Sequence, residues 1–152
     1  MAPEAEATLA AGGPAPKIGI VATKASSGDA VIDVIRRLCL ALPEVEERPS
    51  HGAPTFFVRG KKSFVTVWLD GHHDHTFPHL WTAAPPGAQE ELVEREPERF
   101  FRPPYVGHRG WLGVRLDRDL DTDELAAICR EAYRTVAPKQ LVARLDGETV
   151  TG

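Results

Sequence analysis

Cysteine is scarce in this chain of 152 residues, and both copies, Cys39 and Cys129, stand in apolar segments with helical spacing. Two such residues are better explained as buried, reduced thiols than as a disulfide framework. The chain also lacks an apolar run of membrane-spanning length, and its first residues lack the basic start of a secretory signal. We therefore expect a cytoplasmic protein that does not associate with membranes.

The sequence motifs of common catalytic sites are missing too. No serine lies in a Gly-x-Ser-x-Gly turn, neither cysteine has a histidine nearby in sequence, and no glycine-rich segment carries the Gly-Lys-Ser of a phosphate loop. Ser50-His51 is an isolated pair without an orienting acid beside it. The sequence thus does not point to an enzyme, and it gives no reason to expect a cofactor.

Basic residues are in the minority, with 18 Lys and Arg against 22 Asp and Glu. This balance disfavours unspecific nucleic-acid binding by the whole surface. The distribution is uneven, however, because residues 90–98 and 117–124 are acidic whereas residues 48–69 contain no acid. Four basic residues fall in that last range: Arg48, Arg59, Lys61 and Lys62. Their grouping is compatible with a local anion site.

Alternating helix and strand patterns predict one domain at residues 26–147, between a flexible Ala/Pro/Gly-rich tail at 1–25 and a flexible C-terminus at 148–152. Apolar residues at helical spacing predict helices at 29–42, at 86–96, from residue 121 onward, and at 139–145. The first helix should follow a capping box at 26–29, and Thr122 should be the N-cap of the third. β-rich runs predict strands at 55–58, 63–69, 79–83 and 111–116, the first two joined by a hairpin turn. Phe64 should share one face of the second strand with Thr66 and Trp68, and that strand should be central because both its faces are apolar. This order predicts an α+β fold: a single domain with an antiparallel sheet flanked by helices.

The segment at residues 99–111, RFFRPPYVGHRGW, combines four aromatic residues with three arginines. Two interpretations remain open. Tyr105, His108, Arg109 and Trp111 could line a pocket in which Arg109 pairs with a small anion and the aromatic side chains stack on a ring. Alternatively, the aromatic residues anchor the loop to the core and the prolines fix its path, so that only His108 and Arg109 stay free at the tip.

Histidines gather at residues 72–79, where His73 and His75 would face one side of an extended segment. Imidazoles suit zinc or nickel, but the segment lacks a helical His-Glu-x-x-His motif and a supporting cysteine. We expect a histidine-rich surface connection here rather than a metal site, with His73 and His75 as the ligands if a metal binds.

Several segments, taken in order, resemble the MmcQ/YjbR family. They are Gly60-Lys61 before a strand, PERFF at 97–101, PPYVG at 103–107, GWLGV at 110–114, Ala132-Tyr133-Arg134 and Ala137-Pro138-Lys139. The resemblance extends from Asp29 to Leu145 and implies an antiparallel sheet comparable with double-wing DNA-binding folds and, in overall shape, with frataxin-like proteins. Family members are often labelled DNA-binding on that comparison alone, and no catalytic residues can be carried over.

Three hypotheses follow. In the first, the protein is a non-enzymatic DNA-binding module in which Arg48, Arg59, Lys61, Lys62 and Arg109 contact phosphates through a wing-like hairpin and the loop tip. In the second, it binds a small molecule or anion, or is an enzyme of unknown reaction, using the pocket near Tyr105, His108, Arg109 and Trp111. A structural or protein-interaction role is the third. A frataxin-like site would use acids, and Glu90, Glu91 and Glu94 have the helical spacing for one, although a solvated helix face explains them equally well. The ligand and the oligomeric state stay open.

Overall fold

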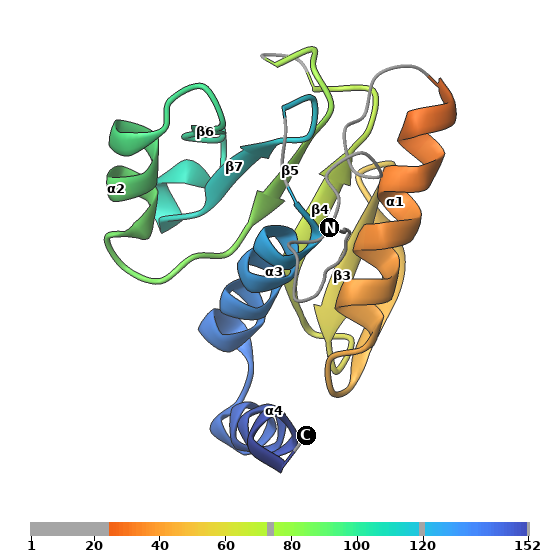
Figure 1. Cartoon of the computed structure of the whole chain (residues 1–152), viewed down its shortest axis with the longest axis vertical. Helices are drawn as coiled ribbons and strands as arrows, with labels where there is room; N and C mark the ends of the chain where they lie inside the picture. Colours follow the sequence, from red (N-terminus) through yellow and green to blue (C-terminus); the bar gives the residue numbers. More distant parts are fainter. Residues whose placement is uncertain (1–24, 73–74, 119–120, 152) are drawn as a thin grey trace, which may run out of the picture.

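The computed structural model describes residues 25–72, 75–118 and 121–151, which form helices and strands (Figure 1). The α+β class and the antiparallel sheet expected from the sequence are confirmed. The expected tail at residues 1–25 lies outside the described ranges, apart from Ala25. The elements are α1 (Ala25–Leu40), β2 (Val45–Ser50), β3 (Ala53–Val58), β4 (Lys62–Trp68), β5 (His79–Thr82), α2 (Ala88–Arg95), β6 (Phe100–Phe101), the 3-10 turn η1 (Gly107–Arg109), β7 (Leu112–Arg115), α3 (Thr122–Val136) and α4 (Lys139–Thr151).

The strands form one six-stranded antiparallel sheet in the order β2-β3-β4-β5-β7-β6. Strand β4 is an inner strand, as its two apolar faces predicted. Strand β2 was not predicted, because its sequence VEERPS contains three charged residues and a proline. Those residue types suit an edge strand, which does not need to be apolar on both faces.

The turn between β3 and β4 is the expected hairpin. Arg59 and Gly60 both have positive φ angles, 55° and 68°, and the Lys61 amide donates to the Val58 carbonyl at 3.0 Å. Two successive left-handed residues match the twist of the flanking strands, and glycine adopts that backbone at low cost.

The expected direction of the Phe64 side chain is wrong. A bulge shifts the register, so that Phe57 pairs with Ser63 whereas Phe56 pairs with Val65. Because one residue more is inserted in β4, Phe64 turns to the opposite side from Thr66 and packs edge-on against Tyr133 of α3, at 5.7 Å between ring centroids. A simple alternation of faces cannot reveal such an insertion.

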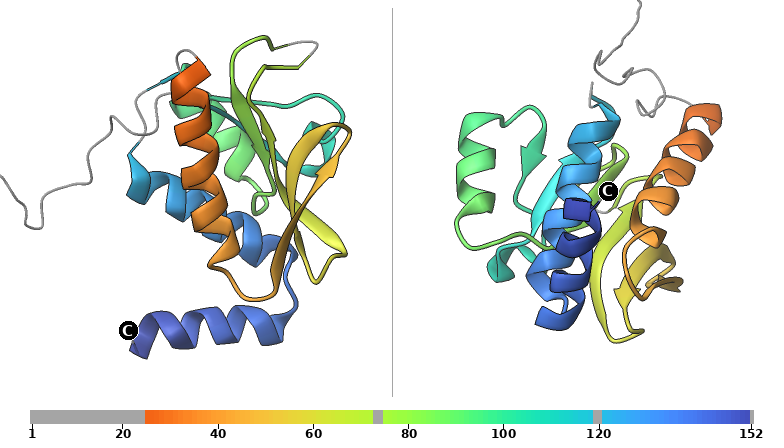
Figure 2. Two further views of the ribbon diagram at one scale, coloured as in Figure 1. Left: turned by 90° about the vertical axis from the view of Figure 1, so that its right-hand side faces the viewer. Right: turned by 60° about the horizontal axis from the view of Figure 1, so that its bottom comes forward.

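Cross-strand partners point to the same side of a sheet, and their register here defines two different faces. We call one the helix face, because α1 and α3 cover it (Figures 1 and 2). We call the opposite one the loop face, because residues of the loops before β5 and before β7 lie on it. The helix face presents Phe56, Val65, Val67, Leu80, Leu112 and Val114, and the loop face presents Thr55, Thr66, Trp68, His79, Trp81, Phe101, Gly113 and Arg115.

Three helix ends differ from expectation. Helix α1 already includes residues 25–28, so the proposed capping box lies inside the helix. Asp121, not Thr122, is the N-cap of α3, because its carboxylate accepts a hydrogen bond from the Glu124 amide. Helix α4 continues to Thr151, beyond the expected end at residue 145, and its backbone is helical through residues 148–151.

The core between the helix face and the helices contains both cysteines. Cys39 of α1 and Cys129 of α3 are buried free thiols, and burial together with a hydrogen bond to Cys129 raises the pKa of Cys39. Nearby, the buried Tyr133 hydroxyl donates to the Pro43 carbonyl at 2.8 Å. These contacts hold α3 to the end of α1 and so fix the covered side of the sheet.

Candidate functional site

A cavity of about 680 Å³ opens on the loop face. Strands β3, β4 and β5 form its floor, and the turn between β2 and β3 and the loop before β7 form its rims. We call it the loop-face cavity. Its walls combine aromatic rings with short hydroxyl side chains. They consist of Ser50, His51, Thr55, Ser63, Thr66, Trp68, His72, Trp81, Tyr105, Val106, Arg109 and Trp111.

The aromatic wall is built from residues far apart in sequence. The Trp68 and Trp81 rings have centroids 5.0 Å apart, and the His72 ring lies 4.6 Å from the first and 5.1 Å from the second. Tyr105 meets His72 edge-on at 5.8 Å. Neither Trp68 nor Trp81 has an acceptor for its indole N–H among the described residues. A buried donor without a partner costs about 1–3 kcal/mol, so these groups favour an acceptor brought from outside.

Tyr105 is held at the cavity rim in a strained backbone. Its φ angle is +66°, and the Val106 amide donates to the Pro104 carbonyl at 2.6 Å, which makes a γ-turn of the rarer kind. The side chain is nevertheless 71% exposed, although large aromatic residues usually become buried. Backbone strain and an exposed ring at the same residue are typical of a site kept for binding rather than for packing.

Arg109 carries the positive charge of the cavity. Its guanidinium carbon lies 5.3 Å from the centroid of the Trp111 ring, which orients the group through a cation–π contact. Within the described ranges, no carboxylate lies within ion-pair distance of Arg109, and no Asp or Glu lines the cavity. An anion entering here would therefore meet an uncompensated arginine.

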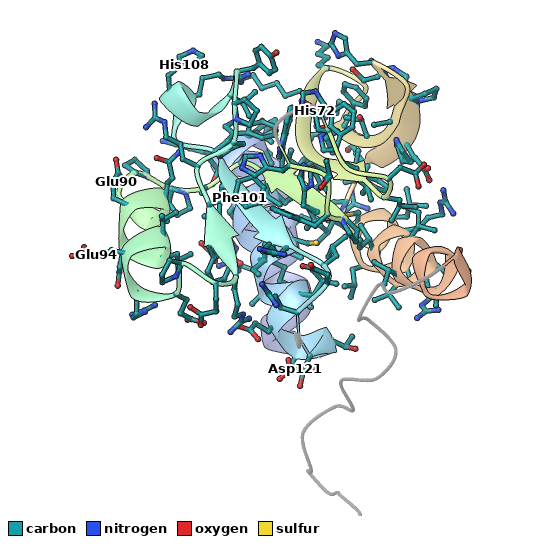
Figure 3. The ribbon with its side chains drawn as sticks, turned by 90° about the horizontal axis from the view of Figure 1, so that it is seen from above. His72, Glu90, Glu94, Phe101, His108 and Asp121 are labelled. Carbon is teal, nitrogen blue, oxygen red and sulfur yellow. The ribbon has the colours of Figure 1, made fainter. Side chains whose placement is uncertain are left out.

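Of the four side chains that the sequence suggested for a pocket, the structure brings three together. Tyr105, Arg109 and Trp111 line the cavity, whereas His108 does not and is exposed at the outer edge of η1 (Figure 3). The core-anchor interpretation also holds in part, because Phe100 and Trp111 are buried. Trp111 thus serves both roles at once.

Gln89 of α2 holds the rim of the cavity from behind. Its buried amide Nε2 donates to the Gly107 carbonyl at 2.8 Å and to the Trp111 carbonyl at 2.6 Å. Arg102 in turn donates to the Gln89 Oε1 at 3.3 Å. The Gly107 carbonyl belongs to the first residue of η1 and the Trp111 carbonyl lies two residues after its end, so Gln89 sets the position from which Arg109 projects. Sequence reasoning missed this residue, because a glutamine in an acidic helix carries no sign of a partner eighteen or more residues away.

The hydroxyl wall comes from the β2–β4 region. Thr55 and Thr66 are directly paired across the strands, and Ser63 lies on the same side because of the bulge. Ser50 and His51 complete the wall, with Ser50 Oγ 3.3 Å from His51 Nδ1. In the part of the chain that the structure describes, no carboxylate orients His51. The pair therefore lacks the third member that would activate the serine as a nucleophile.

The histidine segment lies over the loop face beside the cavity. His75 packs on Phe101 at 4.3 Å, and His79 is fully buried, with Nδ1 donating to the Phe77 carbonyl at 2.7 Å. Burial above all, together with the nearby His75, His72 and Arg115, lowers the pKa of His79 to about 4 although the hydrogen bond to Phe77 acts to raise it, so this imidazole is neutral at pH 7. His73 lies outside the described residues. Among the residues that are described, no three His, Cys, Asp or Glu side chains gather as metal ligands.

The five basic residues proposed for nucleic acid do not share one location. Arg59, Lys61 and Lys62 lie at the turn between β3 and β4, whereas Arg109 lies on η1 and lines the loop-face cavity. Arg59 pairs with Glu44 at 2.9 Å. Arg48 stacks on Phe57 at 3.9 Å and donates to the Gly60 carbonyl, with Glu46 at 3.9 Å. Lys61 and Lys62 are exposed, and neither has an ion-pair partner in the described ranges.

The acidic residues of α2 face away from the sheet. Glu90 and Glu94 point outward in Figure 3, and Glu90, Glu91 and Glu94 are all exposed. Glu91 pairs with Arg95 one turn later at 3.2 Å. This arrangement is a solvated helix face.

No helix among the described residues has the length and apolar character needed to cross a membrane.

Comparison with known proteins agrees with the resemblance noted from the sequence. A family model described as YjbR matches residues 40–135, a range that includes most of the quoted motifs. Among solved structures, the crystal structure of Deinococcus radiodurans protein DR2400, described with the family-model domain DUF419, matches with a TM-score of 0.59. The match covers 77% of this chain and 86% of that chain at 20% identity, so it supports the fold alone. No curated protein matches the chain.

Proposed function

The chain belongs to the YjbR family, and we propose that it is a binding protein for a small molecule held in the loop-face cavity. The observation that carries the proposal is the convergence of Tyr105, Arg109 and all three tryptophans of the chain on one cavity of about 680 Å³. Ligand pockets in proteins have about this volume and combine apolar walls with a few polar groups.

Three further features support binding at this place. The indole N–H groups of two wall residues lack acceptors among the described side chains and backbone. Tyr105 is exposed on a strained turn. Arg109 is oriented by Trp111 but has no anionic partner in the described ranges. The unpaired indole groups and the strained turn cost stability in the empty protein, and a bound ligand would offset that cost, while Arg109 is available to pair with an anion.

We propose binding rather than catalysis as the role of the cavity. Ser50 and His51 are the only serine–histidine pair that the described lining contains, and no acid orients them. A reactive nucleophile normally needs a base that is itself held by a third group. Free, buried cysteines are consistent with a reducing compartment, so we also propose a cytoplasmic location.

Nuclear magnetic resonance can test the proposal directly. Because the chain has three tryptophans and all of them line the cavity, every indole N–H resonance reports on its occupancy. A screen of small cellular metabolites should yield a ligand that moves at least two of the three indole signals and leaves the Lys61 and Lys62 amides unchanged. If ligands are found only by signals elsewhere in the molecule, or none is found, the cavity is not a binding site.

DNA binding through the β3–β4 hairpin is the second candidate function. It is favoured by Lys61 and Lys62, which are exposed on a wing-like turn and have no ion-pair partner among the described residues. Such contacts would give a salt-dependent affinity without sequence reading. Duplex DNA at low salt should then move the amides of residues 59–62, and the Lys61→Glu, Lys62→Glu double variant should abolish binding. For the change of charge, the single variants Lys61→Glu and Lys62→Glu are each compared with Lys139→Glu on α4, and equal weakening by all three would argue against the hairpin.

A further inference from the structure

We infer that the ligand of the loop-face cavity is a flat heteroaromatic ring that carries a single anionic group. This inference rests on the proposed function, because it names the chemical class that the same cavity would take. It is drawn from three properties of the walls: the positions of the aromatic rings, the single positive charge, and the hydrogen-bonding groups that lie near the rings.

The rings select a flat partner. Trp68, Trp81 and Trp111 all line the cavity, with Tyr105 at the rim. Flat π-faces offer large contact areas to another ring, and stacking of a ring on an aromatic side chain favours binding whatever the substituents on that ring. An aliphatic ligand would fill the same volume without using these faces.

The charge selects an anion and limits its number. Arg109 is the only Lys or Arg among the described residues of the lining, and no Asp or Glu accompanies it. The guanidinium can donate two parallel hydrogen bonds to one carboxylate or phosphate, which a lysine cannot do in the same way. A second anionic group on the ligand would find no second Lys or Arg in the described lining and would lose its hydration at a cost.

Hydrogen-bonding groups between the rings and the arginine select heteroatoms on the ring. Trp81 is only 7% exposed, and its indole N–H has no acceptor within the described part of the chain. Thr66 is the cross-strand neighbour of Trp81, and the hydroxyls of Thr66 and Ser63 can both donate and accept. A ring with its own nitrogen or oxygen acceptors satisfies such a lining, whereas a hydrocarbon ring leaves it unsatisfied.

A ring joined to one phosphate occurs in free mononucleotides and also in each unit of an unpaired nucleic-acid strand. The test therefore uses adenosine 5′-monophosphate, adenosine, ribose 5-phosphate and a hexamer of deoxyadenylate as probes for binding to the full chain. Adenosine 5′-monophosphate should bind at least tenfold more tightly than adenosine and than ribose 5-phosphate, and should move the indole signals. A hexamer that binds much more tightly than the monophosphate identifies a strand as the source, and equal or weaker hexamer binding identifies a free molecule.

Two exposed substitutions separate the parts of the site. Arg109→Gln should weaken the binding of the monophosphate about tenfold and leave the binding of adenosine unchanged. Arg130 is an exposed arginine of α3 outside the lining, and Arg130→Gln should change the affinity for neither probe. Tyr105→Leu should weaken the binding of the monophosphate and of adenosine by the same factor and leave the binding of ribose 5-phosphate unchanged. Unchanged melting temperatures would show that both variants fold.

The inference is overturned if adenosine or ribose 5-phosphate binds as tightly as the monophosphate, or if Arg109→Gln weakens all probes alike. It is also overturned if none of the probes binds while the metabolite screen finds a ligand without a ring or without an anionic group, and in that case the proposed function stands. If no compound of either set moves an indole signal, the proposed function fails as well.

Discussion

The two faces of the sheet use neighbouring residues of the same strands for opposite purposes. On the helix face, Phe56, Val67 and Leu80 are completely buried beneath α1 and α3. On the loop face, the alternate positions carry Trp68, Trp81 and threonines around an open cavity. One face of this short sheet therefore provides close packing that stabilises the fold. The other face has a cavity, a strained turn and, among the described residues, indole N–H groups without acceptors. Substitutions on the two sides should therefore have effects of different kinds.

The sharpest contrast is between Phe64 and Tyr105. Phe64→Ala should lower the free energy of unfolding by about 3–5 kcal/mol, because the ring is fully buried against Tyr133 and its removal leaves a cavity. Tyr105→Ala should change it by less than about 0.5 kcal/mol, because the ring is mostly exposed. Urea unfolding of both variants measures the difference. Similar losses would mean that the loop face is as much a packing surface as the helix face.

The pH dependence of stability should come from the loop face, through His79. Its folded pKa of about 4 lies below the ordinary value of 6.5, so between these values the unfolded chain binds a proton that the folded chain does not. Stability is full above pH 6.5 and should fall by about 3 kcal/mol as the pH drops from 6.5 to 4. Unfolding curves across this range check the prediction.

A matched pair of variants assigns that effect. His79→Gln should flatten the dependence between pH 6.5 and 4, at the expense of some stability at pH 7, whereas His108→Gln at the exposed tip of η1 should leave the profile as it is. If the slope survives in His79→Gln, His79 is not the group that causes it.

Gln89 tests whether the cavity rim can be loosened without unfolding the helix face. Gln89→Met keeps the size of the side chain but leaves the Gly107 and Trp111 carbonyls without their donor, which should cost about 2 kcal/mol. Hydrogen exchange should speed up at residues 105–111 more than in β4 or α3. Glu90→Gln, its exposed neighbour on α2, serves as control. Uniformly faster exchange across the whole domain would show that the rim is not an independent unit.

The smallest effect concerns the helix that covers the other face. Asp121→Ala removes the carboxylate that caps α3 at the Glu124 amide and should cost about 1 kcal/mol, while Asp121→Asn should retain most of it. The loss should appear in thermal unfolding without any change in ligand binding. A change of ligand affinity in Asp121→Ala would mean that the two faces are coupled.

The sequence predicted those parts of the molecule that depend on neighbours in the chain. The β3–β4 hairpin followed from a glycine between two β-rich runs, and Tyr105, Arg109 and Trp111 were recognised as a group because they lie within seven consecutive residues. Trp68 and Trp81 were missed as wall residues, because only the pairing of β4 with β5 brings them together. The sequence therefore predicts the cavity residues of one rim only.

Other errors have equally physical causes. The bulge in β4 reverses the side of Phe64, and no local pattern of apolar residues can report an inserted residue. Strand β2 was overlooked because its charged residues suit solvent, and its pairing with β3 at the sheet edge is what makes it a strand. The basic residues looked like one group in the sequence, yet Arg48 and Arg59 have acidic partners in β2 and just before it. Charge along a chain does not reveal which charges are already neutralised in space.

Gly113 lies on the loop face at the centre of β7, and the Phe101 ring occupies the space that a side chain there would need. That ring also supports His75 and His79, so the stack cannot move aside without exposing a buried imidazole. The two positions should therefore vary together among relatives of this chain: a larger residue at 113 is compatible only with a smaller one at 101. Such paired replacements would show how the loop face has changed in evolution independently of the helix face, at two positions that are not in the cavity lining.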